Sequence, residues 1–297
     1  MQTDSSPDEG TGAAEIAVVK PVFIIGAPGS GTTLLYNTLC THRDLAYLTL
    51  NMLRAGIHKH GRLVGDRRAT LFKIHNLLHK DRASTVPHEA NAFWIRYFGT
   101  YDYKTEDDFT PEMRAQLRKN VAAVQNLWKR PRFINKNLQH CVRVRILDRI
   151  FPDAKFVHII RDGRAVAYSI LNKKGEANPT MFLLSLKKIL GDKYRTDRSD
   201  LFNYGQAWAE LISRAREARA FGPSRYCEVR YEDLISNPHD EIKRVVDFCE
   251  LDWYSEFEKN IPKTSNMNTK WMHRADDDQK RDLEESTQEL RKALGMA

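Results

Sequence analysis

The feature that most constrains the fold is a glycine-rich turn between an apolar segment and a helical pattern. Residues 18–27 (VVKPVFIIGA) are rich in β-branched residues and run into a Pro/Gly cluster, which predicts a strand. From Thr32 onward, apolar residues recur at helical spacing. Gly26, Gly29 and Gly31 stand between these segments. A turn of this kind feeds a helix N-terminus and presents backbone N–H groups to an anion, so it predicts a phosphate cradle.

Two common nucleotide loops differ from this one. The segment GAPGSGTT has the spacing of the P-loop GxxxxGK[ST] from Gly26 to Gly31, with Thr33 at the Ser/Thr position. Thr32, however, stands where a P-loop has the lysine that reaches the β- and γ-phosphates. The dinucleotide fingerprint GxGxxG also fails, because the glycines run G-x-x-G-x-G. We therefore expect a cradle for a group smaller than a triphosphate.

The rest of the chain alternates strand patterns with helix patterns. Residues 154–162 (AKFVHIIRD) form the clearest strand, and their near-continuous apolar run is typical of a parallel sheet covered on both faces. Further strands are expected at 45–49, at 132–135 and within 224–234, and helices at 110–129, 139–151, 205–221 and 276–292. We predict an α/β fold with a P-loop-like doubly wound sheet, mostly parallel, with helices on both faces.

Length and composition fit one enzyme domain. The 297 residues are compatible with a single large α/β domain, and we find no internal repeat or linker. Residues 1–18 begin with acidic, small and polar residues, so we expect a disordered tail there and one domain over 19–297. No apolar run approaches the ~20 residues that span a membrane.

The N-terminus and the cysteines predict a cytoplasmic location. MQTDSSPDEGTGAAE is the reverse of a secretory signal, which has a basic start and an apolar middle. The four cysteines are widely scattered and show no metal-ligand spacing. With no export signal, reduced thiols are favoured over two disulfides.

The formal net charge of +8 predicts anionic ligands. Nucleic acid is a competing explanation, but the sequence lacks the interleaved basic and aromatic residues of single-strand binders, so we expect no nucleic-acid partner. The densest basic stretch covers residues 54–82. An anionic glycan, a lipid head group and a solvated basic face all remain open for that stretch.

Several motifs resemble those of the PAPS-dependent sulfotransferases. GAPGSGTTLL (26–35) is similar to their 5′-phosphosulfate loop, G-x-P-[RK]-S-G-T-T-L-L. INKN (134–137), RIFPDAKFVHIIRDGRAVAYS (149–169) and YEDLISNP (231–238) resemble the tyrosylprotein sulfotransferases and their bacterial relatives. The resemblance implies transfer of a sulfuryl group from 3′-phosphoadenosine 5′-phosphosulfate (PAPS), with 3′,5′-ADP (PAP) as product. A hydroxyl or amine would accept the group, on a carbohydrate, a glycolipid or another small metabolite.

The resemblance assigns residues to the two ends of PAPS. It implies that the 5′-phosphosulfate is held by Pro28, Gly29, Ser30, Gly31, Thr32 and Thr33. Arg161 and Ser169 would bind the 3′-phosphate, with Lys173 as a basic residue one helical turn beyond the serine. Ser169 and Lys173 share a helix face, and Arg161 closes a strand at the sheet edge where ligands gather. A salt bridge from Arg161 to Asp162 or another acid, and an ordinary helix serine, are the alternatives.

Two later segments resemble cofactor-binding positions. Tyr231 in YED matches a family position near the cofactor, although a buried tyrosine that anchors a strand end is an equal alternative. Lys270 and Trp271 lie in a segment, NTKWMH, that is similar to one closing over the nucleotide in relatives.

The catalytic residues depart from the usual pattern at two positions. Most relatives carry arginine or lysine where this chain has Gly29, and residues 46–51 lack the glutamate of the tyrosylprotein sulfotransferases. Lys136 in INKN matches a family lysine near the leaving group, so we expect Lys136 to supply the positive charge.

The general base is expected in the segment PHEANAFW, which resembles an acidic, aromatic segment of bacterial relatives. Glu89 is the first candidate and His88 the second, since either can take a proton from an acceptor hydroxyl. The alternatives are a carboxylate at a helix N-terminus and a surface histidine.

Two other functions remain open from the sequence. A P-loop kinase-like enzyme would share the glycine loop and the basic cleft, but it needs the lysine that Thr32 replaces. A catalytically inactive nucleotide-binding module would explain Gly29 and the absent glutamate. Sulfuryl transfer needs less charge compensation than γ-phosphoryl transfer, and no DxD or His/Cys ligand set occurs, so we expect no metal.

Overall fold

The computed structural model describes residues 17–53, 86–172 and 179–296, except for 265 and 267. Lys173, the basic stretch at 54–82 and residues 1–16 of the expected tail lie outside the described residues. Val18, at the end of that expected tail, is buried in the core.

In the described residues, five strands form one sheet in the order β2-β3-β1-β4-β5. Every neighbouring pair is parallel. The strands are β1 (Val22–Ile25), β2 (Leu45–Ala46), β3 (Arg132–Lys136), β4 (Lys155–Ile160) and β5 (Tyr226–Arg230). The sequence-based prediction of a parallel α/β sheet is confirmed.

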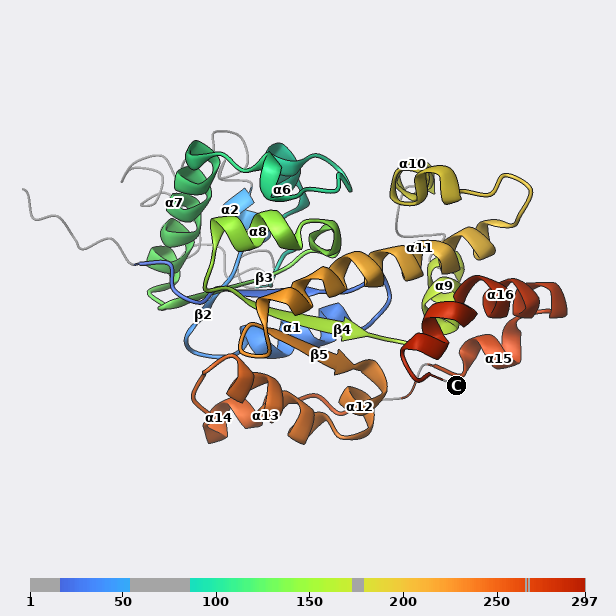
Figure 1. The fold of residues 1–297 in the computed structure, drawn as a ribbon. Coiled ribbons are helices and arrows are strands. Elements are labelled where there is room, and N and C mark those ends of the chain that lie inside the picture. Colours follow the sequence, from blue (N-terminus) through green and yellow to red (C-terminus); the bar gives the residue numbers. More distant parts are fainter. Residues whose placement is uncertain (1–16, 54–85, 173–178, 265, 267, 297) are drawn as a thin grey trace, which may run out of the picture.

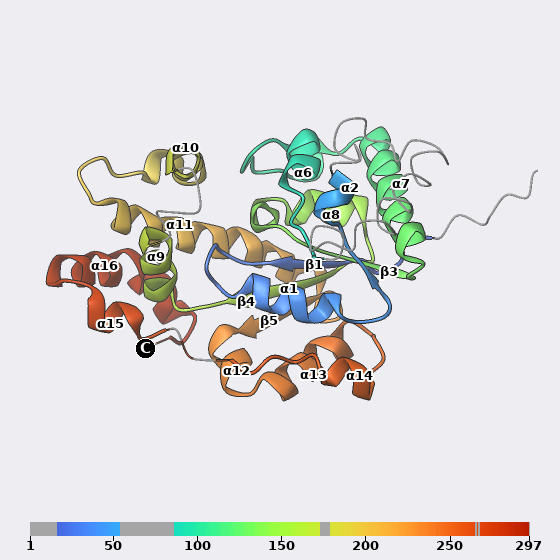
Figure 2. The same ribbon diagram turned by 180° about the vertical axis from the view of Figure 1, so that it is seen from behind.

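Helices cover both faces of the sheet (Figures 1 and 2). Phe23 and Ile25 of β1 face one core, and Val22 and Ile24 face the other. The first core is covered by α6 (Asn91–Phe98), α7 (Pro111–Trp128), α8 (Val144–Ile150) and α11 (Asp200–Ala215). The second is covered by α1 (Thr32–Cys40), α12 (Tyr231–Ser236), α13 (Pro238–Phe248) and α14 (Ser255–Glu258).

A third cluster of helices lies beyond the carboxyl end of β4. It is built around Trp271 and Leu283 and includes apolar residues of α11. The helices that complete it are α9 (Gly163–Asn172), α10 (Pro179–Leu190), α15 (Lys270–Arg274) and α16 (Asp277–Ala293). This cluster places the end of the chain beside the edge of the sheet where ligands of parallel sheets bind.

Short helical segments complete the described elements: α2 (Leu50–Met52), η2 (Glu106–Asp108), η3 (Leu138–Val142), η4 (Gly191–Lys193) and η5 (Arg216–Phe221). The helix expected at 139–151 is therefore two pieces, because Arg143 leaves the helical region with φ −136° and ψ 11°. The helix expected at 205–221 starts earlier, because the side chain of Ser199 accepts a hydrogen bond from the N–H of Phe202 and caps it. No helix among the described residues is both long and apolar enough to cross a membrane.

Candidate active site

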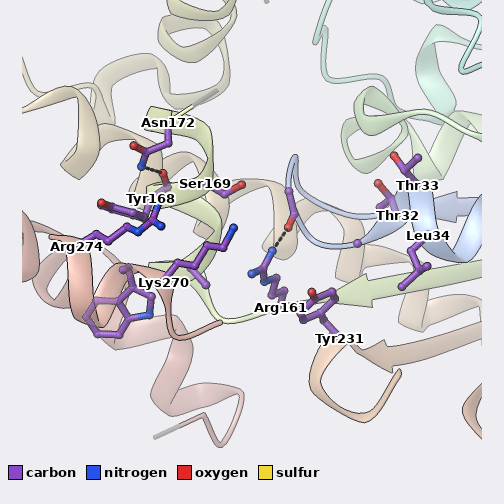
Figure 3. A pocket seen from close by; sticks show the side chains of 14 residues that line it. Thr32, Thr33, Leu34, Arg161, Tyr168, Ser169, Asn172, Tyr231, Lys270 and Arg274 are labelled. Carbon is purple, nitrogen blue, oxygen red and sulfur yellow. Dashed lines mark hydrogen bonds between the residues drawn. The ribbon is translucent and has the colours of Figure 1, made fainter. Parts of the chain in front are cut away.

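A cavity of about 600 Å³ opens at the carboxyl end of the sheet (Figure 3). The glycine loop and the start of α1 form one wall, with Gly29, Gly31, Thr32, Thr33 and Leu34. The end of β4 and helix α9 form the second, with Arg161, Ala165, Tyr168, Ser169 and Asn172. Helices α12 and α15 close the third side with Tyr231, Lys270, Trp271 and Arg274.

The charge of the cavity is unbalanced. Of the described residues that line it, Arg161, Lys270 and Arg274 are cationic and none is acidic. Helix α1 adds the positive end of its dipole and the N–H groups of its first turn. A concave site with cations and no carboxylates attracts an anionic ligand.

The loop has glycine at two left-handed positions, only one of which is also crowded. Gly31, the residue before α1, has φ +91°, and a Cβ there would lie 2.6 Å from Cδ2 of Tyr231. Gly29 has φ +82°, but a Cβ there would meet Ser169 Oγ at an ordinary 3.5 Å. The left-handed backbone disfavours a side chain at both positions, and crowding adds to this at Gly31.

Arg161 connects three walls of the site. Its Nη1 donates to the carbonyl of Gly29 (2.7 Å), and its Nε donates to Oδ1 of Asn268 (2.6 Å). Its guanidinium lies over the ring of Tyr231, 4.3 Å from the centroid. Burial lowers the pKa of Arg161 from its ordinary value, against the opposing influence of Tyr231 and nearby carboxylates. An arginine stays charged at any physiological pH, so a buried cation is held at the loop.

The alternative role considered for Arg161, a salt bridge with Asp162, is not the arrangement observed. Asp162 pairs instead with Arg164, at 2.6 Å. Arg164 also pairs with Glu284 and lies over the ring of Trp271, 4.8 Å from the centroid. The neighbouring arginine therefore supports the third wall, and Arg161 faces the cavity.

Most of the residues that the sequence assigned to PAPS lie together in this cavity. They are Gly29, Gly31, Thr32, Thr33, Arg161, Ser169, Tyr231 and Lys270. The side chain of Tyr231 is buried and also lines the cavity, an arrangement compatible with both alternatives given for this residue.

Pro28 and Ser30 do not line the cavity. Pro28 borders a small apolar void beside Val166 and Trp208. Ser30 is buried, and its N–H closes a turn on the carbonyl of Ala27 (3.1 Å). These two residues shape the loop from behind.

Five lining residues were not expected from the sequence: Leu34, Ala165, Tyr168, Asn172 and Arg274. A signal for some of them was present. On α9, Ala165, Tyr168 and Asn172 share the helical face of Ser169, at spacings of three and four residues. Arg274 lies one helical turn beyond Lys270 on α15.

Lys136 and Glu89 form an ion pair at the end of β3. Lys136 is the last residue of β3 and pairs with Ile24 of β1, just before the glycine loop. Its Nζ donates to the carboxylate of Glu89. The Lys136 side chain is 3% exposed and that of Glu89 is 30% exposed, so the carboxylate is the accessible half of the pair. Neither residue is among those that line the cavity.

His88 is engaged by the backbone. Its Nδ1 accepts a hydrogen bond from the N–H of Ala90 (2.9 Å). Burial is the main cause that lowers the pKa of His88 from its ordinary value; the Lys136 cation also lowers it, and the Glu89 carboxylate opposes. A neutral ring whose Nδ1 accepts carries its proton on Nε2, where it can donate but not act as a base.

The family follows from a comparison with known proteins. Residues 21–255 match the family model described as "Sulfotransferase family". The match covers more than three quarters of the chain, so the chain belongs to the sulfotransferase family, and the resemblance inferred from its motifs is confirmed.

Two curated relatives are similar over part of their length. The omega-hydroxy-beta-dihydromenaquinone-9 sulfotransferase Stf3 of Mycobacterium tuberculosis is 30% identical over 142 residues, 46% of this chain and 32% of that protein. A putative protein-tyrosine sulfotransferase of Caenorhabditis briggsae is 26% identical over 232 residues, 78% of this chain and 66% of that protein. The chain thus spans about one third and two thirds of their respective lengths.

Solved structures share the fold. Sulfotransferase STF9 from Mycobacterium avium superposes with a TM-score of 0.57 at 15% identity, over 94% of this chain and 78% of that chain. The sulfotransferase domain from the curacin biosynthetic pathway gives 0.56 at 17% identity, over 95% and 99%. Among the residues that the structure describes, no group of three or more His, Cys, Asp or Glu side chains is placed to hold a metal ion.

Proposed function

We propose that this protein transfers a sulfuryl group from PAPS to a hydroxyl acceptor and releases PAP. The observation that carries the proposal is the cavity beside the glycine loop, where three cations and no acidic side chain line the described walls. PAPS carries about two negative charges at each end, and its size suits a cavity of about 600 Å³.

The two ends of the donor have separate partners in this proposal. The loop and the first turn of α1 hold the 5′-phosphosulfate through backbone N–H groups and the hydroxyls of Thr32 and Thr33. Arg161 and Ser169 hold the 3′-phosphate. Support comes from their common cavity and from the short Arg161–Gly29 hydrogen bond, which ties the two anion sites together.

Transfer needs a cation at the leaving oxygen and a base at the acceptor. The acceptor oxygen bonds to sulfur as the bond from sulfur to the 5′-phosphate oxygen breaks, and PAP leaves with that oxygen. Lys136 stabilises the negative charge on the departing phosphate, and Glu89 takes the proton of the acceptor. Their position at the end of β3, beside the strand that feeds the loop, supports this division.

We propose a hydroxyl on a carbohydrate, a glycolipid or another small metabolite as the acceptor. The names of the two relatives, an omega-hydroxy menaquinone sulfotransferase and a protein-tyrosine sulfotransferase, both describe hydroxyl acceptors. A cytoplasmic location is part of the proposal, supported by four buried cysteines that form no disulfide.

The first experiment is titration calorimetry with PAP in the presence of EDTA, with ATP as the comparison ligand. We expect PAP to bind in the micromolar range or tighter, because both of its phosphates find cations, and ATP to bind more weakly. Stronger binding of ATP would favour the kinase-like function.

The second experiment follows transfer from labelled PAPS to panels of carbohydrates, glycolipids, phenols, amines and peptides. Label on a hydroxyl acceptor is the expected result. Tight PAP binding without turnover on any panel would favour an inactive nucleotide-binding module.

A further inference from the structure

The turn that carries Glu89 has a conformation that its sequence does not favour. Ala90, the next residue, has φ 57° and ψ 44° and is fully buried. This left-handed region crowds any residue with a Cβ, and glycine or asparagine normally occupies it. An alanine stays there only if surrounding contacts hold it.

Asn137, the residue after Lys136, makes the required contacts. Its Nδ2 donates to the carbonyl of Glu89 (3.3 Å) and to Oδ1 of Asn91 (2.8 Å), so one buried amide grips the chain before and after Ala90. Its Oδ1 accepts from the N–H of Gln139 (2.9 Å) and caps η3.

Two further contacts act on the same turn. Nδ1 of His88 accepts from the N–H of Ala90, as described above. Nδ2 of Asn135 lies 3.5 Å from the carbonyl of Glu89, and its Oδ1 is 3.1 Å from Nε2 of the buried His140. The three consecutive residues 135–137 therefore meet Glu89 at its backbone and at its carboxylate.

We propose that Asn137 is a positioning residue, which holds the Glu89 turn so that the carboxylate lies against Lys136. Asn137 acts on sulfuryl transfer through Glu89 and makes no contact with the donor. The inference rests on the proposed function, in which Glu89 is the base. It assigns a task to the second asparagine of the INKN motif.

The decisive variant is Asn137→Asp, which keeps the shape and the acceptor that caps η3 but loses the donor to Glu89 and Asn91. Misplacement of a catalytic group by about 1 Å costs about 10²-fold in rate. We expect kcat to fall by about that factor, while KM for PAPS and the Kd of PAP stay within about twofold, because Asn137 does not line the donor cavity.

Asn91→Ala is the matched variant. It should keep the fold because Asn91 is exposed, and it removes only the hydrogen bond from Asn137 Nδ2 to Asn91. We expect a smaller loss, roughly fivefold to tenfold in kcat, with PAP affinity again unchanged. It decides the question if Asn137→Asp does not fold.

A double variant tests whether Asn137 acts through Glu89. Glu89→Gln alone should lower kcat by ~10²–10⁴-fold. If Asn137 acts through that carboxylate, the double variant with Glu89→Gln and Asn137→Asp should be no slower than the single variant Glu89→Gln.

The outcomes separate the inference from the function on which it rests. Three outcomes would each overturn the positioning role: normal kcat in both Asn137→Asp and Asn91→Ala, additive losses in the double variant, or a parallel loss of kcat and PAP affinity. Normal turnover of Glu89→Gln would instead refute Glu89 as the base, and the inference would fail with it.

Discussion

The cavity beside the glycine loop and the Lys136–Glu89 pair lie at the same end of the sheet but differ in charge balance. The described residues of the cavity include three cations and no carboxylate. At the end of β3 the buried cation already has its counter-ion. A cavity lined by cations without carboxylates is stabilised when an anion binds. A cation that already has a counter-ion adds little to the affinity for an anion. Mutations in the two regions should therefore change the affinity for PAPS and the rate of turnover separately.

Lys136→Met has the largest expected effect, and it tests whether the Lys136–Glu89 pair governs turnover. Methionine keeps the apolar stem but removes the cation, and loss of one group that stabilises developing charge costs about 10²–10³-fold in kcat. KM for PAPS should stay within about twofold, because the bridging oxygen carries little charge before transfer, whereas the Kd of PAP should rise, because PAP carries that charge in full. Steady-state kinetics with labelled PAPS and calorimetry with PAP measure these quantities.

The control for this variant is Lys104→Met, at a lysine that pairs with Asp108 and belongs to neither the cavity lining nor the Lys136–Glu89 pair. It should leave kcat unchanged. A Lys136→Met protein whose KM for PAPS rose as steeply as its kcat fell would contradict the separation between the two regions.

Arg161→Ala tests the affinity half. A charge-assisted phosphate contact is worth about 1.5–3 kcal/mol, so the Kd of PAP should rise by roughly ten- to a hundredfold. The loop also loses the hydrogen bond to the carbonyl of Gly29. Calorimetry measures the affinity, and thermal unfolding measures the stability.

Arg195→Ala is the matched control, because Arg195 forms an exposed pair with Asp197. It should bind PAP as the parent does. Unchanged PAP affinity in Arg161→Ala would show that the 3′-phosphate lies elsewhere.

His88 offers a sharper test within the catalytic half. If its task is to accept the N–H of Ala90, His88→Asn should keep most activity, because an asparagine Oδ1 accepts the N–H two residues on in the same way. His88→Ala loses about 1 kcal/mol of support, roughly fivefold in kcat. A steady-state comparison in which both variants lose activity by 10²-fold or more would make His88 the base.

The sequence predicted the parts of the site that are local. The strand, glycine loop and helix from Val22 to Cys40 are adjacent in the chain, so spacing and glycine positions were sufficient. Arg161 and Ser169 followed from one strand–helix unit. The contact of α15 with this unit depends on packing of Trp271 over a separation of about a hundred residues. No local pattern contains that contact, so only the resemblance of NTKWMH to relatives pointed to it.

The hydrogen bond that His88 accepts could not be predicted from the sequence for another reason. A histidine beside a glutamate is a common arrangement for a general base. Only the structure shows that Nδ1 of His88 already accepts a hydrogen bond from the N–H of Ala90, whose backbone is left-handed. The same holds for Asn137, whose contacts reach the main chain of Glu89, since a sequence pattern does not specify main-chain partners across fifty residues.

The smallest expected effect concerns Glu228, a second ion-paired carboxylate that belongs to neither the cavity lining nor the Lys136–Glu89 pair. Glu89 has Lys136 as partner, whereas Glu228 pairs with Arg216 and Arg219 (both 2.9 Å), and these hydrogen bonds overcome desolvation to lower its pKa to about 2. The ordinary pKa of glutamate is about 4.3. Because the folded-state pKa is depressed, the contribution to stability is complete above about pH 4.3 and is lost as the pH falls toward 2.

Glu228→Gln should lower Tm at pH 7 by about 2–4 °C, for a loss of about 1 kcal/mol, and the difference from the parent should shrink between pH 4.3 and 3. Its kcat at pH 7 should match that of the parent, unlike Glu89→Gln. Thermal unfolding across pH 3–7 measures the first expectation, and a pH-independent difference in Tm would mean that Glu228 stabilises the fold by packing and not by charge.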